Sequence, residues 1–132
     1  MTFVDTSAWF AILVPGDQNH HRANTWLKAY PGQLLTSDFV IDETLTLPRS
    51  RGQGDEALDW EATMFGPNSP AAVHYLTPAE VAAGWDVFRR FADKDWSFTD
   101  CTSKTVMESL GIATAFSFDQ HFRQFGTVTV VP

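Results

Sequence analysis

The chain has 132 residues, a length that suits one domain over residues 1–132 and is too short for two ordinary domains. Hydrophobic residues make up 44% and charged residues 19%, which argues against disorder, and the single cysteine, Cys101, excludes an internal disulfide. The net charge of −7 speaks against a simple electrostatic nucleic-acid binder, unless part of the acid is gathered where cations bind. No secretory signal and no apolar stretch of membrane-spanning length is visible, so we expect a soluble, cytoplasmic protein without membrane association.

The first half of the chain alternates short apolar runs with helical patterns. In chain order we expect a strand at 2–4, a helix up to 14, a helix at 19–29, a strand at 34–35, a helix from 36 or 37 through 47, and a helix at 55–65. Ser7 is the predicted N-cap of the first helix. Pro48 is predicted to stop or kink the third helix, because proline lacks a backbone N–H.

The second half has stronger helix signals. Thr77 precedes Pro78 and Glu80, the pattern of a capping box with proline at the first helical position. Thr99 is the predicted cap of a later helix that ends at Gly111. The remaining elements expected are strands at 73–76, 114–118 and 127–131 and a short helix at 120–125. Strands that alternate with helices predict an α/β sandwich with a mostly parallel sheet.

Three aspartates occupy related positions in this predicted fold. Asp5 and Asp119 each follow a strand, and Asp100 begins a helix. In open α/β sheets the binding site lies beyond the carboxyl ends of the strands, so these side chains are expected in one crevice. Each also has a purely structural interpretation, since aspartate commonly caps a helix or favours the positive end of its dipole. Only the combination of three is informative.

Three neighbouring carboxylates would repel one another. Two unit charges about 4 Å apart interact with roughly 4 kcal/mol at an effective dielectric constant near 20. A raised pKa or a bound cation relieves that repulsion. Oxygen ligands without His or Cys favour Mg²⁺ or Mn²⁺ over Zn²⁺, and such an ion meets phosphate groups in many sites.

A fourth acid comes from the predicted helix before Pro48. Glu43 lies four residues after Phe39 and three after Val40, so it borders the apolar face of this helix. Asp42 lies nearer the opposite face. The pattern favours Glu43 over Asp42 as the residue that faces the crevice.

Taken together, these segments resemble the PIN-domain family, and within it the VapC-type toxins of bacterial toxin–antitoxin systems. The matching segments are FVDTSA at 3–8, TSD at 36–38, DETL at 42–45, SFTDC at 97–101, LGI at 110–112 and SFDQHF at 117–122. They occur in family order and span nearly the whole chain.

The resemblance implies a three-layer α/β/α sandwich and an endoribonuclease that needs Mg²⁺ or Mn²⁺ and acts on single-stranded RNA. It carries the catalytic acids over as Asp5, Glu43, Asp100 and Asp119. Asp5 and Asp100 would be metal ligands, Asp119 would complete the metal site directly or through water, and Glu43 would orient the attacking water or bind a second ion. Ser7 and Thr99 would hold carboxylates in place. It further implies a homodimer and a cognate antitoxin of a type II system.

Other side chains have both functional and structural interpretations. Trp9 and Phe10 lie near the crevice and are candidates for base stacking or a dimer contact. His121 is expected at the edge of the pocket, more as a structural or RNA-contacting residue than as a general base. The candidate phosphate contacts are Arg49, Arg51, Lys94 and Lys104, although a solvated surface charge is favoured for each. The segments 48–54 and 66–72 have no assigned role.

Other functions have less support. A non-catalytic PIN-like module that binds RNA or protein has no need to keep four mutually repelling acids. A phosphatase with an aspartyl nucleophile usually has a second aspartate two residues later, where this chain has Ser7. A phospho-accepting receiver domain needs paired acids early in the chain, and these are missing.

Overall fold

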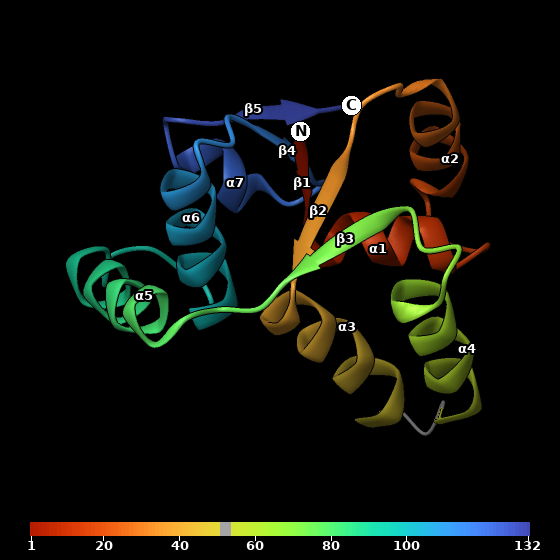
Figure 1. The fold of residues 1–132 in the computed structure, drawn as a ribbon, viewed down its shortest axis with the longest axis horizontal. Helices are drawn as coiled ribbons and strands as arrows, with labels where there is room; N and C mark the ends of the chain where they lie inside the picture. Colours follow the sequence, from red (N-terminus) through yellow and green to blue (C-terminus); the bar gives the residue numbers. More distant parts are fainter. Residues whose placement is uncertain (51–53) are drawn as a thin grey trace.

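The computed structural model describes residues 1–50 and 54–132, and its centre is a sheet of five parallel strands. The strands are β1 (Thr2–Val4), β2 (Leu34–Ser37), β3 (Ala71–His74), β4 (Thr114–Phe116) and β5 (Thr129–Val131). Their order across the sheet is β3-β2-β1-β4-β5, so β1 is central and β3 and β5 are the edges (Figure 1).

The described residues form seven helices, which are α1 (Thr6–Leu13), α2 (His20–Ala29), α3 (Asp38–Ser50), α4 (Gly54–Phe65), α5 (Pro78–Arg90), α6 (Phe98–Leu110) and α7 (Gln120–Gln124). In Figure 1, α5, α6 and α7 lie to the left of the strands, and α1, α2 and α4 lie to the right. Helices on both sides of a parallel sheet make an α/β/α sandwich, which confirms the predicted fold class.

The strand order places a topological switch point in the middle of the sheet. From β1 the chain proceeds outward through β2 to β3, and then returns across the sheet to β4 on the other side of β1. Val4 of β1 pairs with Phe116 of β4, so these two strands end side by side. A crevice forms beyond the carboxyl ends of strands at such a point, because the connections leave in opposite directions.

The central strands are buried on both faces, as the apolar sequence of a parallel sheet requires. Phe3, Val4 and Phe116 are completely buried, and Trp9 of α1 is completely buried beside them. The indole Nε1 of Trp9 donates to the Thr36 hydroxyl at 3.2 Å, so its one polar atom is satisfied. The ends of β1 and β4 therefore rest on a rigid core.

Two helix starts carry capping boxes. At α5 the Thr77 hydroxyl accepts from the Glu80 backbone N–H, and Glu80 accepts from the Thr77 N–H, as predicted. At α6 the cap is Ser97, not Thr99, and its box partner is Asp100. The serine lies three residues before the acid, which is the spacing that the reciprocal hydrogen bonds need.

Glycine is required at two positions, in one case by the backbone conformation and in the other by close helix packing. Gly111 ends α6 with φ of 68°, the left-handed conformation predicted for a C-terminal glycine. Gly84 of α5 is buried against α6, where a Cβ would lie 2.9 Å from the Thr102 Cγ2. The absence of a side chain at Gly84 therefore permits the close approach of the two helices.

Several predicted boundaries were wrong. Asp5, not Ser7, caps α1, because its carboxylate accepts the Ser7 N–H. Pro48 does not end α3; it lies in the last turn, where few backbone hydrogen bonds are lost. Strand β3 lies two residues earlier than predicted, where its register pairs Ala71 with Leu34. None of the helices that the structure describes is long and apolar enough to cross a membrane.

Candidate active site

The four predicted acids line one pocket at the carboxyl ends of β1 and β4. The pocket has a volume of about 300 Å³, and the described residues that line it are Asp5, Thr6, Ser7, Phe10, Glu43, Leu47, Asp95, Ser97, Asp100, Asp119 and His121. Asp5 follows β1, Asp119 follows β4, Glu43 comes from α3 and Asp100 from the first turn of α6. The topology therefore brings together residues that are 114 positions apart in the sequence.

Asp5 is fixed by hydroxyl groups from two strand ends. Its side chain is 3% exposed, and its Oδ2 accepts from the Ser7 hydroxyl at 2.8 Å and the Ser117 hydroxyl at 2.9 Å. The Ser7 Oγ also accepts from the Phe118 N–H, and the Ser117 Oγ accepts from the Asp119 N–H. These serines tie the chain after β1 to the chain after β4.

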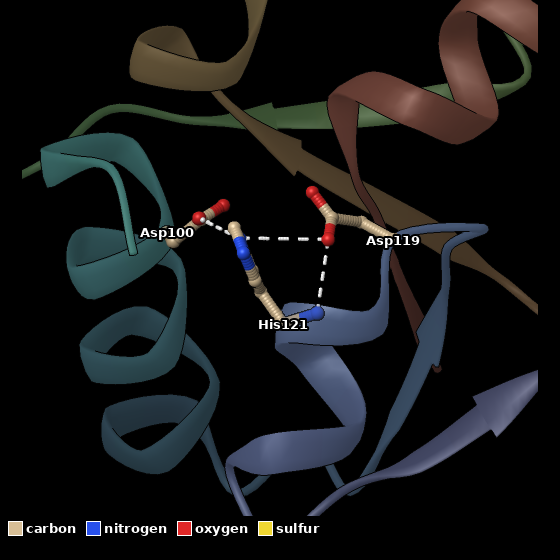
Figure 2. A group of neighbouring side chains, drawn as sticks. All are labelled: Asp100, Asp119 and His121. Atoms are coloured by element: carbon tan, nitrogen blue, oxygen red, sulfur yellow. Dashed lines mark hydrogen bonds and ion pairs between the residues drawn. The ribbon is translucent and has the colours of Figure 1, made fainter. Parts of the chain in front are cut away.

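Asp100 and Asp119 share a histidine. The Nδ1 of His121 lies 2.9 Å from Asp100 Oδ2 and 3.5 Å from Asp119 Oδ1 (Figure 2). Asp119 Oδ1 also accepts the His121 backbone N–H, so Asp119 caps the short helix α7. Among the described pocket-lining residues, His121 is the only one with a basic side chain.

Glu43 faces the pocket and Asp42 does not. Glu43 Oε2 accepts from the Thr6 hydroxyl at 2.9 Å, which connects α3 to the start of α1. Asp42 is exposed and does not line the pocket. The prediction from helical phase that Glu43, and not Asp42, faces the pocket is therefore confirmed.

Each of the four acids uses one carboxylate oxygen for its hydrogen bonds within the protein and leaves the other without a partner in the described part of the chain. The bonded atoms are Asp5 Oδ2, Glu43 Oε2, Asp100 Oδ2 and Asp119 Oδ1. Four carboxylates are thus held in place, and each keeps one oxygen available for a ligand.

The electrostatics of the pocket are unfavourable when it contains only protein atoms. Burial raises the pKa of Asp5 to about 7, and the charge of Asp100 adds to this, against the lowering effect of the Ser7 and Ser117 hydrogen bonds. Burial also raises the pKa of Glu43 and of Asp100, and the Asp119 charge acts on both in the same direction. The pKa of His121 is raised as well; burial alone would lower it, but the neighbouring Asp100 and Asp119 prevail.

The donor atoms suit a divalent cation. One ligand atom from each of Asp100, Asp119 and His121 lies within 4.8 Å of the other two. Asp5 is not part of that close group, although it lines the same pocket. The His121 nitrogen in this close group differs from the predicted ligand set, which contained only oxygen atoms.

Sequence reasoning missed some supporting residues. Ser97 takes the role expected of Thr99, because its backbone N–H donates to Asp100 Oδ2 at 3.0 Å. The spacing of Ser97 and Asp100 within SFTD carries that signal, as the spacing of Thr77 and Glu80 did at the other helix. Ser117 had no local signal, since its contact with Asp5 is made across the sheet.

The structure separates the predicted RNA-contacting residues by their exposure and their partners. Trp9 is buried and cannot stack a base, whereas Phe10 is partly exposed and lines the pocket. Lys104 is buried and paired with Glu108, so the structure supports neither the candidate phosphate contact nor the favoured interpretation as a solvated surface charge. Lys94 pairs loosely with Asp93, and the side chains of Arg49 and Arg51 lie outside the described residues.

Comparisons with known proteins agree with this geometry. The PIN-domain family model matches residues 2–128. The chain is 33% identical over 132 residues to the 23S rRNA-specific endonuclease VapC20 of Mycobacterium tuberculosis, covering 100% of this chain and 99% of that protein. The crystal structure of that VapC20, described as a sarcin–ricin loop cleaving toxin, superimposes with a TM-score of 0.89 at 32% identity over 100% of both chains.

A more distant structure shares the fold alone. PAE2754 from Pyrobaculum aerophilum superimposes with a TM-score of 0.64 at 15% identity, over 98% of this chain and 88% of that one. The family model covers nearly the whole chain, and the curated relative is similar over its whole length. The chain therefore belongs to the PIN-domain family and, within it, to the VapC proteins.

Proposed function

We propose that this protein is a metal-dependent endoribonuclease and the toxin of a type II toxin–antitoxin system. The observation that carries the proposal is the set of four fixed carboxylates, each with one available oxygen, in one pocket of about 300 Å³. The full-length similarity to a ribosomal-RNA endonuclease supports RNA as the substrate and makes 23S rRNA the first candidate. The proposed unit is a single PIN-like domain over residues 1–132.

The pocket fits Mg²⁺ or Mn²⁺ by the chemistry of its donors. Asp5, Asp100 and Asp119 would hold the ion, and a cation would offset both the burial and the mutual repulsion that raise the pKa of Asp5 and Asp100. When bound, such an ion supplies Lewis acidity towards the phosphodiester and towards the attacking water.

Glu43 has the properties of a group that positions the attacking water. Its Oε2 is fixed by Thr6, and its Oε1 has no partner among the described residues. Its raised pKa makes it a better proton acceptor than an ordinary glutamate. Glu43 would therefore orient the water through Oε1 and take its proton as the water oxygen bonds to phosphorus and the bridging P–O bond to the leaving ribose oxygen breaks.

Asp119 and His121 shape the other side of the pocket. The His121 imidazole holds Asp100 Oδ2 in one orientation, while the capping bond at α7 does the same for Asp119 Oδ1. Groups fixed in this way need little reorganisation when a phosphate enters, which is the main source of catalytic advantage in such sites.

The test is RNA cleavage by the purified protein, free of antitoxin, with Mg²⁺, Mn²⁺ or EDTA. The substrates are 23S rRNA and an unrelated RNA of similar length, and the variants are Asp100→Asn, Glu43→Gln and Asp42→Asn. We expect metal-dependent cleavage that both pocket variants lose and that Asp42→Asn retains, since Asp42 is exposed next to Glu43 but outside the pocket. If the protein binds metal but cleaves neither RNA, the alternative of a non-catalytic RNA- or protein-binding module is favoured.

Partners and location follow from the same proposal. A cognate antitoxin would inhibit the toxin, and co-purification with the product of a neighbouring reading frame tests this. We also propose a cytoplasmic homodimer, with the exposed aromatic pair Trp85 and Phe88 of α5 as the surface to test. Light scattering of the wild type and of Trp85→Ser should distinguish dimer from monomer.

A further inference from the structure

A second hollow adjoins the acidic pocket. It has a volume of about 410 Å³ and is lined by Ser7, Phe10, Asp17, Asn19, Leu47 and Phe118. Three of these residues, Ser7, Phe10 and Leu47, also line the acidic pocket. A ligand group in this hollow would therefore be next to any phosphate held by the carboxylates.

Two phenylalanines give the hollow its flat, apolar surfaces. Phe10 and Phe118 are both partly exposed. Phe10 is held by an edge-on contact with Trp60, with the ring centroids 5.3 Å apart. The backbone N–H of Phe118 donates to the Ser7 hydroxyl, which also contacts Asp5 and Ser117, so the position of Phe118 is coupled to that of the acids.

The polar side of the hollow has an available amide. The Asn19 side chain makes no hydrogen bond to the protein within the part of the chain that the structure describes, and it does not cap α2. Asp17 Oδ1 accepts the Asn19 backbone N–H at 2.8 Å, which fixes this turn. An amide offers both a donor and an acceptor, which is the pattern that the edge of a nucleobase can match.

A cation lies over the outer aromatic ring. The Arg22 guanidinium carbon is 5.8 Å from the centroid of the Phe118 ring, and its Nη2 donates to the Pro132 carbonyl at 3.0 Å. Other guanidinium donors remain available at this exposed position. In a protein with a net charge of −7, one arginine beside the hollow gives the phosphate of a neighbouring nucleotide a local partner.

We propose that this hollow is a nucleobase subsite, which accepts one unstacked base of a single-stranded RNA next to the phosphodiester in the acidic pocket. Phe10 and Phe118 provide the stacking surfaces, Asn19 contacts the edge of the base, and Arg22 contacts the adjoining phosphate. This inference rests on the proposed nuclease function and adds the place where one base of the substrate is held. A base within a duplex is stacked on both sides and cannot enter, so the subsite favours loops and unpaired segments.

The test compares short single-stranded RNA substrates that differ only in one abasic ribose, moved one position at a time on both sides of the cut. We expect an abasic site at one flanking position to lower kcat/KM by roughly 5- to 100-fold, the range for loss of one stacked base. Phe118→Leu keeps the apolar volume but removes the aromatic face, and should reduce cleavage of the intact RNA by a similar factor. In this variant the abasic substitution should have little further effect, because base and ring act as a pair.

Two further variants complete the design. Asn19→Ala removes a side chain that makes no hydrogen bond to the described protein, so folding should be unaffected, and it should flatten the preference among the four bases at the same position. Phe65→Leu is the matched control, since Phe65 is an exposed aromatic outside both hollows. The control should cleave intact and abasic substrates as the wild type does.

A binding measurement separates this inference from the nuclease proposal. Fluorescence anisotropy with the Asp100→Asn protein compares the affinity for intact and abasic RNA without cleavage. A loss of affinity at one abasic position that disappears in the Asp100→Asn, Phe118→Leu double variant supports the subsite even if the wild type proves inactive. If no abasic position changes binding or cleavage in a Phe118-dependent way, the subsite is overturned while the nuclease function stands.

Discussion

Glu80 and Asp100 occupy equivalent positions in two capping boxes, and each accepts a hydrogen bond from a histidine. Both are the third residue of their helices, α5 and α6, and they are 7% and 5% exposed. Glu80 contacts His74 Nε2 at 3.0 Å, and Asp100 contacts His121 Nδ1 at 2.9 Å. By local motif alone the two carboxylates would be expected to behave alike.

Their pKa values nevertheless move in opposite directions. Burial would raise the pKa of Glu80, but hydrogen bonds from Thr77 and His74 outweigh it, and the pKa is lowered. Both oxygens of Glu80 are bonded. Burial raises the pKa of Asp100, and the hydrogen bonds from Ser97 and His121 do not compensate for burial and the charge of Asp119.

The difference lies in the neighbours that the fold supplies. Glu80 sits at an edge of the sheet next to β3, where the groups that shift its pKa include no other acid. Asp100 sits beyond the switch point between β1 and β4, where Asp5, Glu43 and Asp119 converge. The same local motif is thus stabilising in one place and poised for a cation in the other, a contrast typical of functional sites.

The largest expected effect is the difference in RNA cleavage between substitutions at Asp100 and at Glu80. Asp100→Asn should lower RNA cleavage by about 10²–10⁴-fold, since it removes a charge from the proposed metal site and leaves the shape nearly unchanged. Glu80→Gln should leave kcat/KM within about twofold of the wild type, because Glu80 does not line the pocket. Equal losses in both variants, measured on correctly folded protein, would remove the distinction.

The next expected effect is on stability as a function of pH in EDTA. The native pKa of Asp5 is raised to about 7 from the ordinary value of 3.8, so the native state binds more protons between these values. The free energy of unfolding should therefore fall by roughly 2–4 kcal/mol as the pH rises from about 4 to 7, and then level off. Urea titrations at pH 5 and pH 8 measure this change.

Two controls define its origin. Asp5→Asn stays neutral and should remove much of the pH dependence. Excess Mg²⁺ or Mn²⁺ should restore stability at pH 8, because the ion binds the ionised native state and not the unfolded chain. A wild-type protein whose stability in EDTA rises from pH 5 to pH 8 would contradict the raised native pKa of Asp5.

The sequence predicted those features whose signals are local. The strand at Thr2–Val4 was correct because a short β-branched and aromatic run before an acid and a helix allows few other structures. The capping box at Thr77 was recognised because its residues are three positions apart. The register of β3 was not, since its pairing with β2 depends on a contact between segments some 37 residues apart.

The site residues that the sequence predicted are likewise those with local signals. The strand ends predicted Asp5 and Asp119, and helical phase predicted Glu43, because these positions depend on periodicity. The roles of Ser117 and His121 depend on side chains that meet Asp5 and Asp100 across the fold. No spacing in the sequence encodes such contacts, so the geometry had to supply them.

A smaller effect on metal affinity is expected when Asp5 loses one of the hydroxyl groups that hydrogen-bond to it. Ser117→Ala removes one of the two hydroxyl groups on Asp5 Oδ2 and leaves the Asp119 N–H without its acceptor. We expect an affinity for Mn²⁺ about tenfold weaker, the lower end of the range for residues that orient metal ligands. Calorimetric titration measures it, with Ser69→Ala as a control remote from the pocket. An unchanged affinity would mean that Ser7 alone holds Asp5.

The smallest effect returns to Glu80. Glu80→Gln exchanges a charged acceptor of hydrogen bonds from Thr77 and His74 for a neutral one, and should lower the free energy of unfolding by about 1 kcal/mol at pH 7. Because the native pKa of Glu80 is lowered, its contribution exists above its unfolded pKa and is lost as the pH falls through the native value. The difference between variant and wild type should therefore shrink in acid, the reverse of the trend expected for Asp5.

Asp86→Asn is the matched control for this measurement. Asp86 lies on the same helix, but its contact with Arg89 is exposed, and such pairs contribute little to stability. Its substitution should change stability by less than about 0.5 kcal/mol at any pH. If Glu80→Gln behaves like Asp86→Asn, then the two bonded oxygens of Glu80 give no net stabilisation. The contrast between the pKa shifts of Glu80 and Asp100 would then rest on the burial of Asp100 and the charge of Asp119 alone.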